Sequence, residues 1–154
     1  MKKIIMKVAA VCLVAGVVLT SCAKKGCTDS DATNYDSSAT QNDGTCTFKA
    51  GVDMWFSTAP NVVFPGCGSV TYYVNGALIG SSAGNVYSIS QPSCSGGAAH
   101  SSYDLGSAKT VTYSYKVVGD FPTGSSTGGD TTATLYQGSL NLNAHYPCFS
   151  LQLN

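Results

Sequence analysis

Four aspartates between two cysteines are the residues of this 154-residue chain best suited to bind a cation. The cysteines are Cys27 and Cys46, and the aspartates between them are Asp29, Asp31, Asp36 and Asp43. Carboxylate oxygens in a constrained loop are the ligands that Ca²⁺ prefers. An EF-hand is excluded, because counting from Asp29 the sixth position holds Asn34 instead of Gly and the twelfth holds Thr40 instead of Glu. Two interpretations stay open: a weak Ca²⁺ site, or aspartates that form Asx-turns and keep the loop soluble.

A Gly-x-Ser-x-Gly pattern at residues 80–84 matches the nucleophile elbow of serine hydrolases, with Ser82 as the nucleophile. Asp120 or Asp130, and then His145, follow in Ser–Asp–His order. The elbow needs a strand–turn–helix in a large α/β sheet, and this chain is too short and too poor in helix-forming segments to build one. In a chain with 17 Gly the pattern is expected by chance, so we predict a loop here, no catalytic residues and no enzyme.

The two histidines, His100 and His145, are expected to be isolated surface residues. Cys94 and Cys148, like the two histidines, lie too far apart in the sequence to form the closely spaced ligand pairs that are typical of zinc sites. A reactive thiol at Cys148 would need an electropositive neighbourhood, and no basic residue lies near it in the sequence.

Four aromatic residues are candidates for a platform that stacks on a sugar or a peptide: Trp55, Phe56, Tyr73 and Tyr103. Packing in a small core explains Trp55 and Phe56 more simply. Tyr73 does not fall on the apolar positions of its alternating segment. It is therefore the aromatic residue of the four that we most expect on the surface.

The segments that must position these residues alternate between apolar and polar side chains, which is typical of half-buried strands. The clearest runs from Thr110 to Val117, and others cover residues 69–74, 77–79, 140–143 and 149–154. Asn75-Gly76 is a strong hairpin signal, and Gly/Ser/Pro-rich loops are expected near residues 80–85, 91–102 and 122–130. The pattern predicts an all-β fold, an antiparallel β-sandwich over residues 48–154 whose last strand is held in a sheet.

Composition argues against nucleic acid as a partner. The chain contains no Arg and no Glu, and from Gly26 onward three Lys face eight Asp, for a net charge of −5. A basic patch is therefore absent, and phosphate recognition without Arg is disfavoured.

Residues 1–22 resemble the signal of a bacterial lipoprotein. A basic start with three Lys precedes the apolar run 8–19, which is short for a membrane span, and Leu19-Thr20-Ser21-Cys22 matches a lipobox. The resemblance implies removal of residues 1–21, a lipid on Cys22 and a tether over residues 22–26; ordinary secretion and an uncleaved anchor are the alternatives. We therefore expect the protein at the cell envelope, held in the outer membrane by its lipid. Whether the protein faces the periplasm or the cell surface is undecided, although the basic stretch Ala23-Lys24-Lys25 favours the periplasm.

An exported protein meets oxidising conditions, so disulfides are expected. A Cys27–Cys46 bridge would close the acidic loop over residues 27–46 and stabilise it by about 3 kcal/mol. Cys67, Cys94 and Cys148 then leave one cysteine over. Cys67–Cys94 is the favoured pair, because Cys67 opens the hairpin strand and Cys94 ends the segment after it. Cys67–Cys148 stays open, because both residues lie on the polar phase of their strands.

Two further stretches resemble known families. Residues 26–46 resemble a Cys-bracketed, Asp/Asn-rich repeat of exported Bacteroidota proteins. Its matching stretches are Gly26-Cys27-Thr28-Asp29, Ala32-Thr33-Asn34-Tyr35-Asp36, Ala39-Thr40 and Asp43-Gly44-Thr45-Cys46. Residues 52–154 resemble a small Ig-like sandwich of lipoproteins from the same bacteria and, more loosely, PEGA-type domains. The matching stretches are Cys67-Gly68, residues 70–76, Pro92-Ser93-Cys94 and Asp104-Leu105-Gly106 leading into residues 110–115.

These resemblances carry no catalytic residues. Together with the composition they lead us to expect a lipid-anchored envelope protein with a non-enzymatic binding or structural role. The alternative is a carbohydrate- or peptide-binding accessory protein or adhesin, assisted by Ca²⁺. The expected partners are the membrane, through the lipid, and a protein or a glycan, with no cofactor apart from that Ca²⁺.

Overall fold

The computed structural model describes residues 23–94, 96–123, 130–146 and 148–154. The predicted signal and Cys22, the residue predicted to carry a lipid, lie outside these residues. The described chain is all-β, with one four-residue helix, α2 (Pro60–Val63). It divides into a smaller unit, residues 23–30 and 34–46, and a larger unit, residues 31–33 and 47–154. Residues 31–33 thus belong with the larger unit, although they lie between Cys27 and Cys46.

The smaller unit is an irregular loop closed by a disulfide. Its two short strands, β1 (Lys25–Gly26) and β2 (Gln41–Asn42), pair in parallel, and Cys27 bonds to Cys46. The predicted pairing is therefore confirmed. Asn42 and Asp43 each accept a hydrogen bond from the backbone N–H two residues on, at 3.0 Å, and Gly44 takes a positive φ of 78°. These Asx-turns supply the backbone order that a segment with so few apolar residues cannot obtain from a core.

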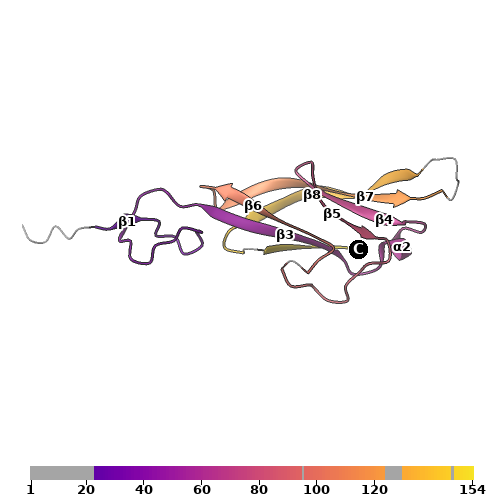
Figure 1. Ribbon diagram of the computed structural model, residues 1–154, viewed down its shortest axis with the longest axis horizontal. Helices are drawn as coiled ribbons and strands as arrows, with labels where there is room; N and C mark the ends of the chain where they lie inside the picture. The colour runs from indigo at the N-terminus through magenta and orange to yellow at the C-terminus, as the bar shows by residue number, and fades with distance from the viewer. Residues whose placement is uncertain (1–22, 95, 124–129, 147) are drawn as a thin grey trace, which may run out of the picture. The chain divides into compact units, whose positions relative to one another are not determined.

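The larger unit contains two sheets, and Figure 1 labels most of their strands. The three-stranded sheet has the order β6-β3-β9, formed by β3 (Phe48–Phe56), β6 (Ala99–Gly106) and β9 (Cys148–Leu153). The four-stranded sheet has the order β5-β4-β7-β8, formed by β4 (Ser69–Val74), β5 (Ala77–Ala83), β7 (Thr110–Phe121) and β8 (Thr131–Asn143). Neighbouring strands are antiparallel except β3 and β9, which run parallel.

Side chains from both sheets meet in one core. Alternate residues of β3, namely Val52, Met54 and Phe56, are fully buried. The ring of Phe56 lies 6.5 Å from that of Tyr72 in β4 and 6.0 Å from that of Tyr136 in β8, measured between centroids. Polar residues of the same alternation lie on the opposite face of the four-stranded sheet, where Ser114, Lys116 and Gln137 are exposed.

Several predicted elements are confirmed. The strand at residues 110–117 is part of β7, and the Asn75-Gly76 hairpin joins β4 to β5 with positive φ at both turn residues, 51° and 79°. Both signs match a type I′ turn. The C-terminal strand is held in a sheet, but it pairs in parallel with β3, so the all-antiparallel prediction is wrong at that pairing.

Two predicted loops are wrong in part. Residues 80–83 continue β5, and residues 99–102 begin β6. Both stretches are rich in Gly, Ser and Ala, which are weak strand formers. Each nevertheless lies on an outer strand of its sheet and is held by backbone pairing to a more apolar neighbour.

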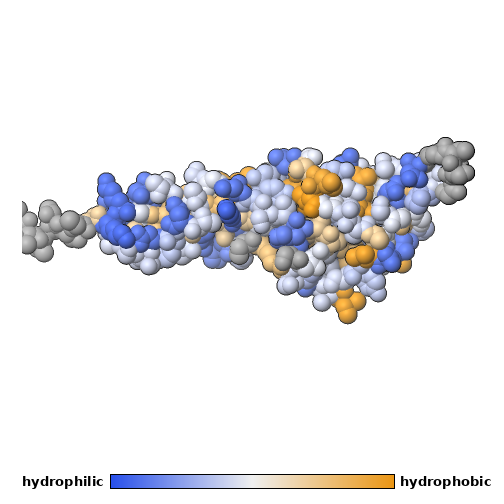
Figure 2. Space-filling model, viewed as in Figure 1, coloured by the Kyte–Doolittle hydropathy of each residue, from blue (hydrophilic) through white to orange (hydrophobic). Residues whose placement is uncertain are grey.

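On the face shown in Figure 2, apolar surface is scattered in small patches among hydrophilic residues. Such scattering is ordinary for a protein surface. Across the described parts of the chain, the structure has no helix whose length and hydropathy would suit a membrane crossing.

Candidate functional site

A groove of about 900 Å³ lies on the outer face of the four-stranded sheet. Residues of β4, β7 and β8, together with the hairpin glycine, line it: Tyr73, Gly76, Ser114, Tyr115, Lys116, Val118, Thr132, Gln137, Gly138 and Ser139. Most of these side chains end in a hydroxyl or an amide. The groove is therefore suited to hydrogen bonding with a polar ligand.

Strand register places three of the lining residues side by side. Tyr73 in β4 lies opposite Lys116 in β7, and Lys116 lies opposite Gln137 in β8. Directly opposed residues of antiparallel strands have Cβ atoms about 5 Å apart, so the three side chains form one row across the sheet. The row presents an aromatic ring, an ammonium group and an amide to the same ligand. Ser114 and Ser139 form the next row.

Gly138 allows the ring of Tyr115 to lie close to β8. A Cβ atom built on Gly138 would stand 2.8 Å from a ring carbon of Tyr115, closer than real contacts allow. A larger residue at position 138 would therefore displace this ring, which lies on the same face of the sheet as Val117 and Tyr136.

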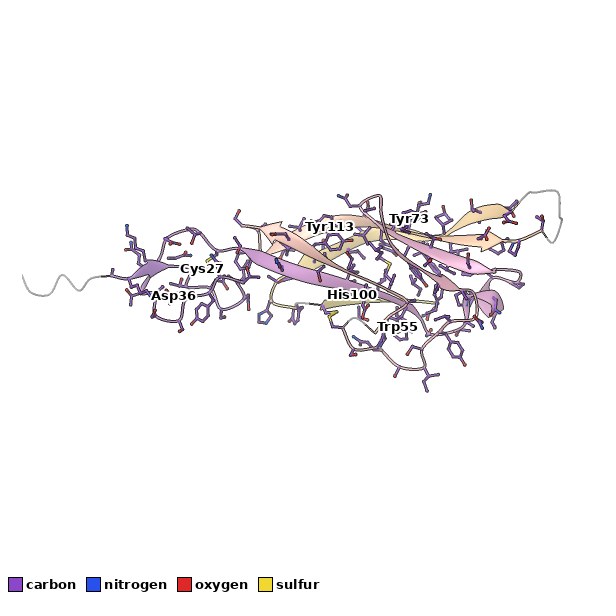
Figure 3. The ribbon with its side chains drawn as sticks, viewed as in Figure 1. Cys27, Asp36, Trp55, Tyr73, His100 and Tyr113 are labelled. Carbon is purple, nitrogen blue, oxygen red and sulfur yellow. A yellow bond between two sulfur atoms is a disulfide. The ribbon has the colours of Figure 1, made fainter. Side chains whose placement is uncertain are left out.

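Only one of the four aromatic residues proposed as a platform lines this groove. Tyr73 is half-buried there, which agrees with its place off the apolar alternation. Trp55 and Phe56 are buried, and the ring of Tyr103 packs against that of Tyr113 at a centroid distance of 5.0 Å. The platform prediction is wrong as a set, because the two sheets place these residues on different faces. In Figure 3, Tyr73 lies on the side of the four-stranded sheet, away from Trp55 and His100.

The sequence analysis missed Lys116 and Gln137 as site residues. The outward direction of Lys116 follows from the alternation of residues 110–117. Its place beside Tyr73 depends on a pairing between strands more than 40 residues apart in the chain, which no local pattern encodes.

A second polar cluster lies on the outer face of the three-stranded sheet. Asp53 in β3 is fully buried, and its Oδ1 lies 3.4 Å from Nδ1 of His100, the residue opposite it in β6. Among the described residues, neither atom has a hydrogen-bond partner. Each of these unsatisfied buried atoms thus has the other as a close polar neighbour, and buried polar groups rarely stay without a partner. The clue in the sequence was one Asp within the apolar run 52–56.

The covering segment, residues 84–94 and 96–98, packs over this cluster. The backbone N–H of Gly97 donates to Oδ2 of Asp53 at 3.3 Å, and that of Ser88 donates to the carbonyl of Phe56 at 2.9 Å. A Cβ atom on Gly97 would stand 2.8 Å from Oδ1 of Asp53 and 2.9 Å from the carbonyl oxygen of Met54. Glycine at position 97 thus permits the segment to lie directly on β3.

The Asp–His pair does not extend to a catalytic triad. Ser150 in β9 is the residue opposite Asp53 on the other side from His100. Two strand spacings, about 10 Å, therefore separate Ser150 from His100. The Ser150 hydroxyl accepts a hydrogen bond from the Trp55 indole N–H at 2.9 Å. These contacts suit a packed interior rather than an activated nucleophile.

The residues of the hydrolase-like pattern also lie apart. Residues 80–83 belong to β5, so the strand–turn–helix of a nucleophile elbow is absent at this position. The Ser82 hydroxyl hydrogen-bonds the Tyr72 hydroxyl at 2.9 Å, and Nδ1 of His145 lies 3.1 Å from Oδ1 of Asp31.

The favoured disulfide prediction is wrong. Cys94 bonds to Cys148, and Cys67, predicted to pair with Cys94 or alternatively with Cys148, is a buried free thiol. Cys67 lies just before β4 in the four-stranded sheet, whereas Cys94 is in the covering segment and Cys148 opens β9 in the three-stranded sheet. The covering segment lies against the three-stranded sheet and brings Cys94 to Cys148, so packing and not nearness in sequence decides the pair. Burial raises the pKa of the Cys67 thiol, which donates to the Ser69 carbonyl at 3.3 Å.

Of the two interpretations of the four aspartates, structural turns agree with the contacts that these residues make. Asp31 belongs to the larger unit, where its carboxylate lies 2.9 Å from Nζ of Lys109 and also contacts His145. In the smaller unit Asp36 pairs with Lys24 at 2.8 Å, and Asp43 accepts from the Thr45 hydroxyl at 2.7 Å. The described part of the chain contains no group of three or more His, Cys, Asp or Glu placed to hold a metal ion.

The same contacts explain the electrostatics of these carboxyls. Hydrogen bonds from Lys109 and then His145 lower the pKa of Asp31. The Lys24 ammonium, helped by Ser38, holds the pKa of Asp36 far below its usual range. Lysines and hydroxyls of the chain itself contact these carboxylates, which agrees with the interpretation of structural turns.

Comparison with known proteins gives no relative: no family model, no curated protein and no solved structure matches the chain. The functional argument therefore rests on the residues and their geometry.

Peptide mapping of the full chain without reducing agent should recover Cys94 joined to Cys148, with Cys67 as a thiol. Alkylation of Cys67 should be slow in the native protein and fast after unfolding, because the residue is buried. A Cys67–Cys94 peptide would contradict the arrangement of the covering segment described above.

Replacing His100 with Ala should destabilise the protein by about 3 kcal/mol, because it leaves the Asp53 carboxylate buried beside a single weak amide donor. Urea unfolding followed by tryptophan fluorescence measures the change. His145→Ala is the matched control: it breaks an exposed contact while Lys109 stays on Asp31, so stability should hardly change. Equal losses of unfolding free energy in the two variants would show that the buried Asp53–His100 pair stabilises the protein no more than the exposed contact does.

Proposed function

We propose that this chain is a lipid-anchored, non-enzymatic binding protein of the cell envelope, and that it binds a carbohydrate chain in the groove of the four-stranded sheet. The row formed by Tyr73, Lys116 and Gln137 is the observation that carries the proposal. A ring beside hydrogen-bonding groups in an open groove matches the two faces of a sugar, one of C–H groups and one of hydroxyls.

The lining favours a glycan over a peptide. A peptide bound along a sheet face obtains specificity from apolar pockets for its side chains. In this groove Val118 is the single aliphatic side chain beyond the aromatic rings, and hydroxyls and amides dominate. An accessory protein or adhesin that captures glycans is therefore the form of the function we favour.

We further propose that residues 48–154 form an Ig-like β-sandwich. Two sheets whose apolar faces meet at Phe56, Tyr72 and Tyr136 support it, as do the hairpin connection of β4 and β5 and the parallel pairing of β3 with β9. A sandwich of this kind presents one outer sheet face to a ligand while the inner faces pack.

The proposed lipid anchor rests on the lipobox-like residues 19–22. Two disulfides in one small chain support an oxidising compartment, because the cytosol keeps thiols reduced. Together they favour export followed by attachment at the envelope.

Tyr73→Ala should lower the affinity for a glycan that binds the groove by about tenfold, since loss of a stacked ring costs about 1.4 kcal/mol. Ligands are found first from the shift in melting temperature of the full chain with pools of neutral and acidic polysaccharides and of peptides. Tyr87→Ala, which removes an exposed ring on the covering segment outside the groove, is the matched control and should bind normally. If no glycan pool shifts the melting temperature, or both variants lose equally, the proposed function is wrong.

Cys22→Ala should abolish incorporation of labelled fatty acid and release the protein from the membrane fraction of the producing bacterium. A Cys67→Ala variant controls for the loss of a cysteine, because that thiol is buried in the larger unit. Protease treatment of intact cells, with a periplasmic marker, then distinguishes a surface from a periplasmic face. Unchanged labelling of Cys22→Ala would exclude the lipid anchor at this residue.

A further inference from the structure

We infer that the ligand of the groove is an acidic glycan, a chain of sugars that carries carboxylate groups, and that Lys116 binds one of these carboxylates. The inference rests on the proposed function, whose ligand class it specifies. The neutral neighbours of Lys116 and the register of its strands carry it.

Lys116 differs from the other two lysines of the larger unit in what lies beside it. Lys109 forms an ion pair with Asp31 at 2.9 Å, and Lys49 in β3 lies opposite Asp104 in β6. Lys49 thus faces an opposite charge across two strands, which stabilises a sheet, and Lys109 faces one outside the sheets. Lys116 instead lies between Tyr73 and Gln137, which are neutral.

The charge of Lys116 is not compensated by the chain. Among the described residues Lys116 takes part in no ion pair, and none of the other residues that line the groove is charged. Asp120 shares its face of β7 but lies four residues along the strand, about 13 Å away. A carboxylate of the ligand is the group that would complete the row.

The chemistry of the lysine ammonium favours a ligand whose sugar ring carries one carboxylate. Lysine is a compact charge with three rotatable donors, and the chain has no Arg with which to grip an anion in bidentate fashion. One ammonium flanked by a ring and an amide suits one charged sugar whose ring stacks on Tyr73 and whose hydroxyls reach Gln137. Because Lys116 is exposed, the contact should weaken as salt rises.

The test compares polygalacturonate with its fully methyl-esterified form, two chains with the same backbone and different charge. Isothermal titration of the full chain in detergent at low salt measures both affinities, with alginate and hyaluronan as further acidic glycans. We expect at least one acidic glycan to bind, and the acidic form of a matched pair to bind more tightly than its ester. Lys116→Gln should weaken binding of the acidic form about fivefold and remove the preference, which an exposed ion pair of about 1 kcal/mol would give.

Lys49→Gln is the matched control, since it makes the same change in net charge outside the groove and should alter the affinity by less than twofold. Equal affinity for acid and ester, or an unchanged affinity in Lys116→Gln, overturns the inference and leaves the proposed function intact. Failure of all acidic glycans while a neutral glycan binds through Tyr73 has the same meaning. Failure of every glycan overturns both, and binding of polyglutamate alone would assign the groove to acidic peptides.

Discussion

Strand β3 is the constraint on which the larger unit depends, because it is paired along both edges and buried on both faces. Its inner face supplies Val52, Met54 and Phe56 to the core. Its outer face carries Asp53 and Trp55, which would be exposed if nothing covered them. Burying a carboxylate costs free energy unless it has partners, so the presence of Asp53 obliges the structure to place His100 and the Gly97 amide against it.

The covering segment keeps these outer residues of β3 away from water. It lacks the alternation of a strand, and a loop of this length is normally mobile. Here a disulfide joins it to β9, and the backbone N–H groups of Ser88 and Gly97 donate to the Phe56 carbonyl and the Asp53 carboxylate of β3. The glycine at position 97 allows the approach, because any side chain there would strike β3. One outer face of the larger unit is thereby sealed.

The outer face of the four-stranded sheet is exposed to solvent, so the outer faces of the two sheets differ. The four-stranded sheet has polar residues at the outward positions of β7 and β8 and needs no cover, because hydroxyls, amides and a lysine are well hydrated. Its register decides which side chains share this outer face. Tyr73, Lys116 and Gln137 make one row because β4, β7 and β8 are neighbours, and a slip by one residue would turn these side chains into the core.

Local features of the sequence determined the strand content, the Asn75-Gly76 turn, the Cys27–Cys46 bridge and the outward direction of Tyr73. Each depends on alternation, turn chemistry or a short separation along the chain. Tertiary structure alone decided the Cys94–Cys148 bridge, the parallel position of β9, the Asp53–His100 pair and the row beside Tyr73. It also dispersed the four aspartates once expected to share a cation. These features depend on which strands become neighbours and in what register, and pairing between segments far apart in sequence is set by the packing of the whole core rather than by the residues that meet.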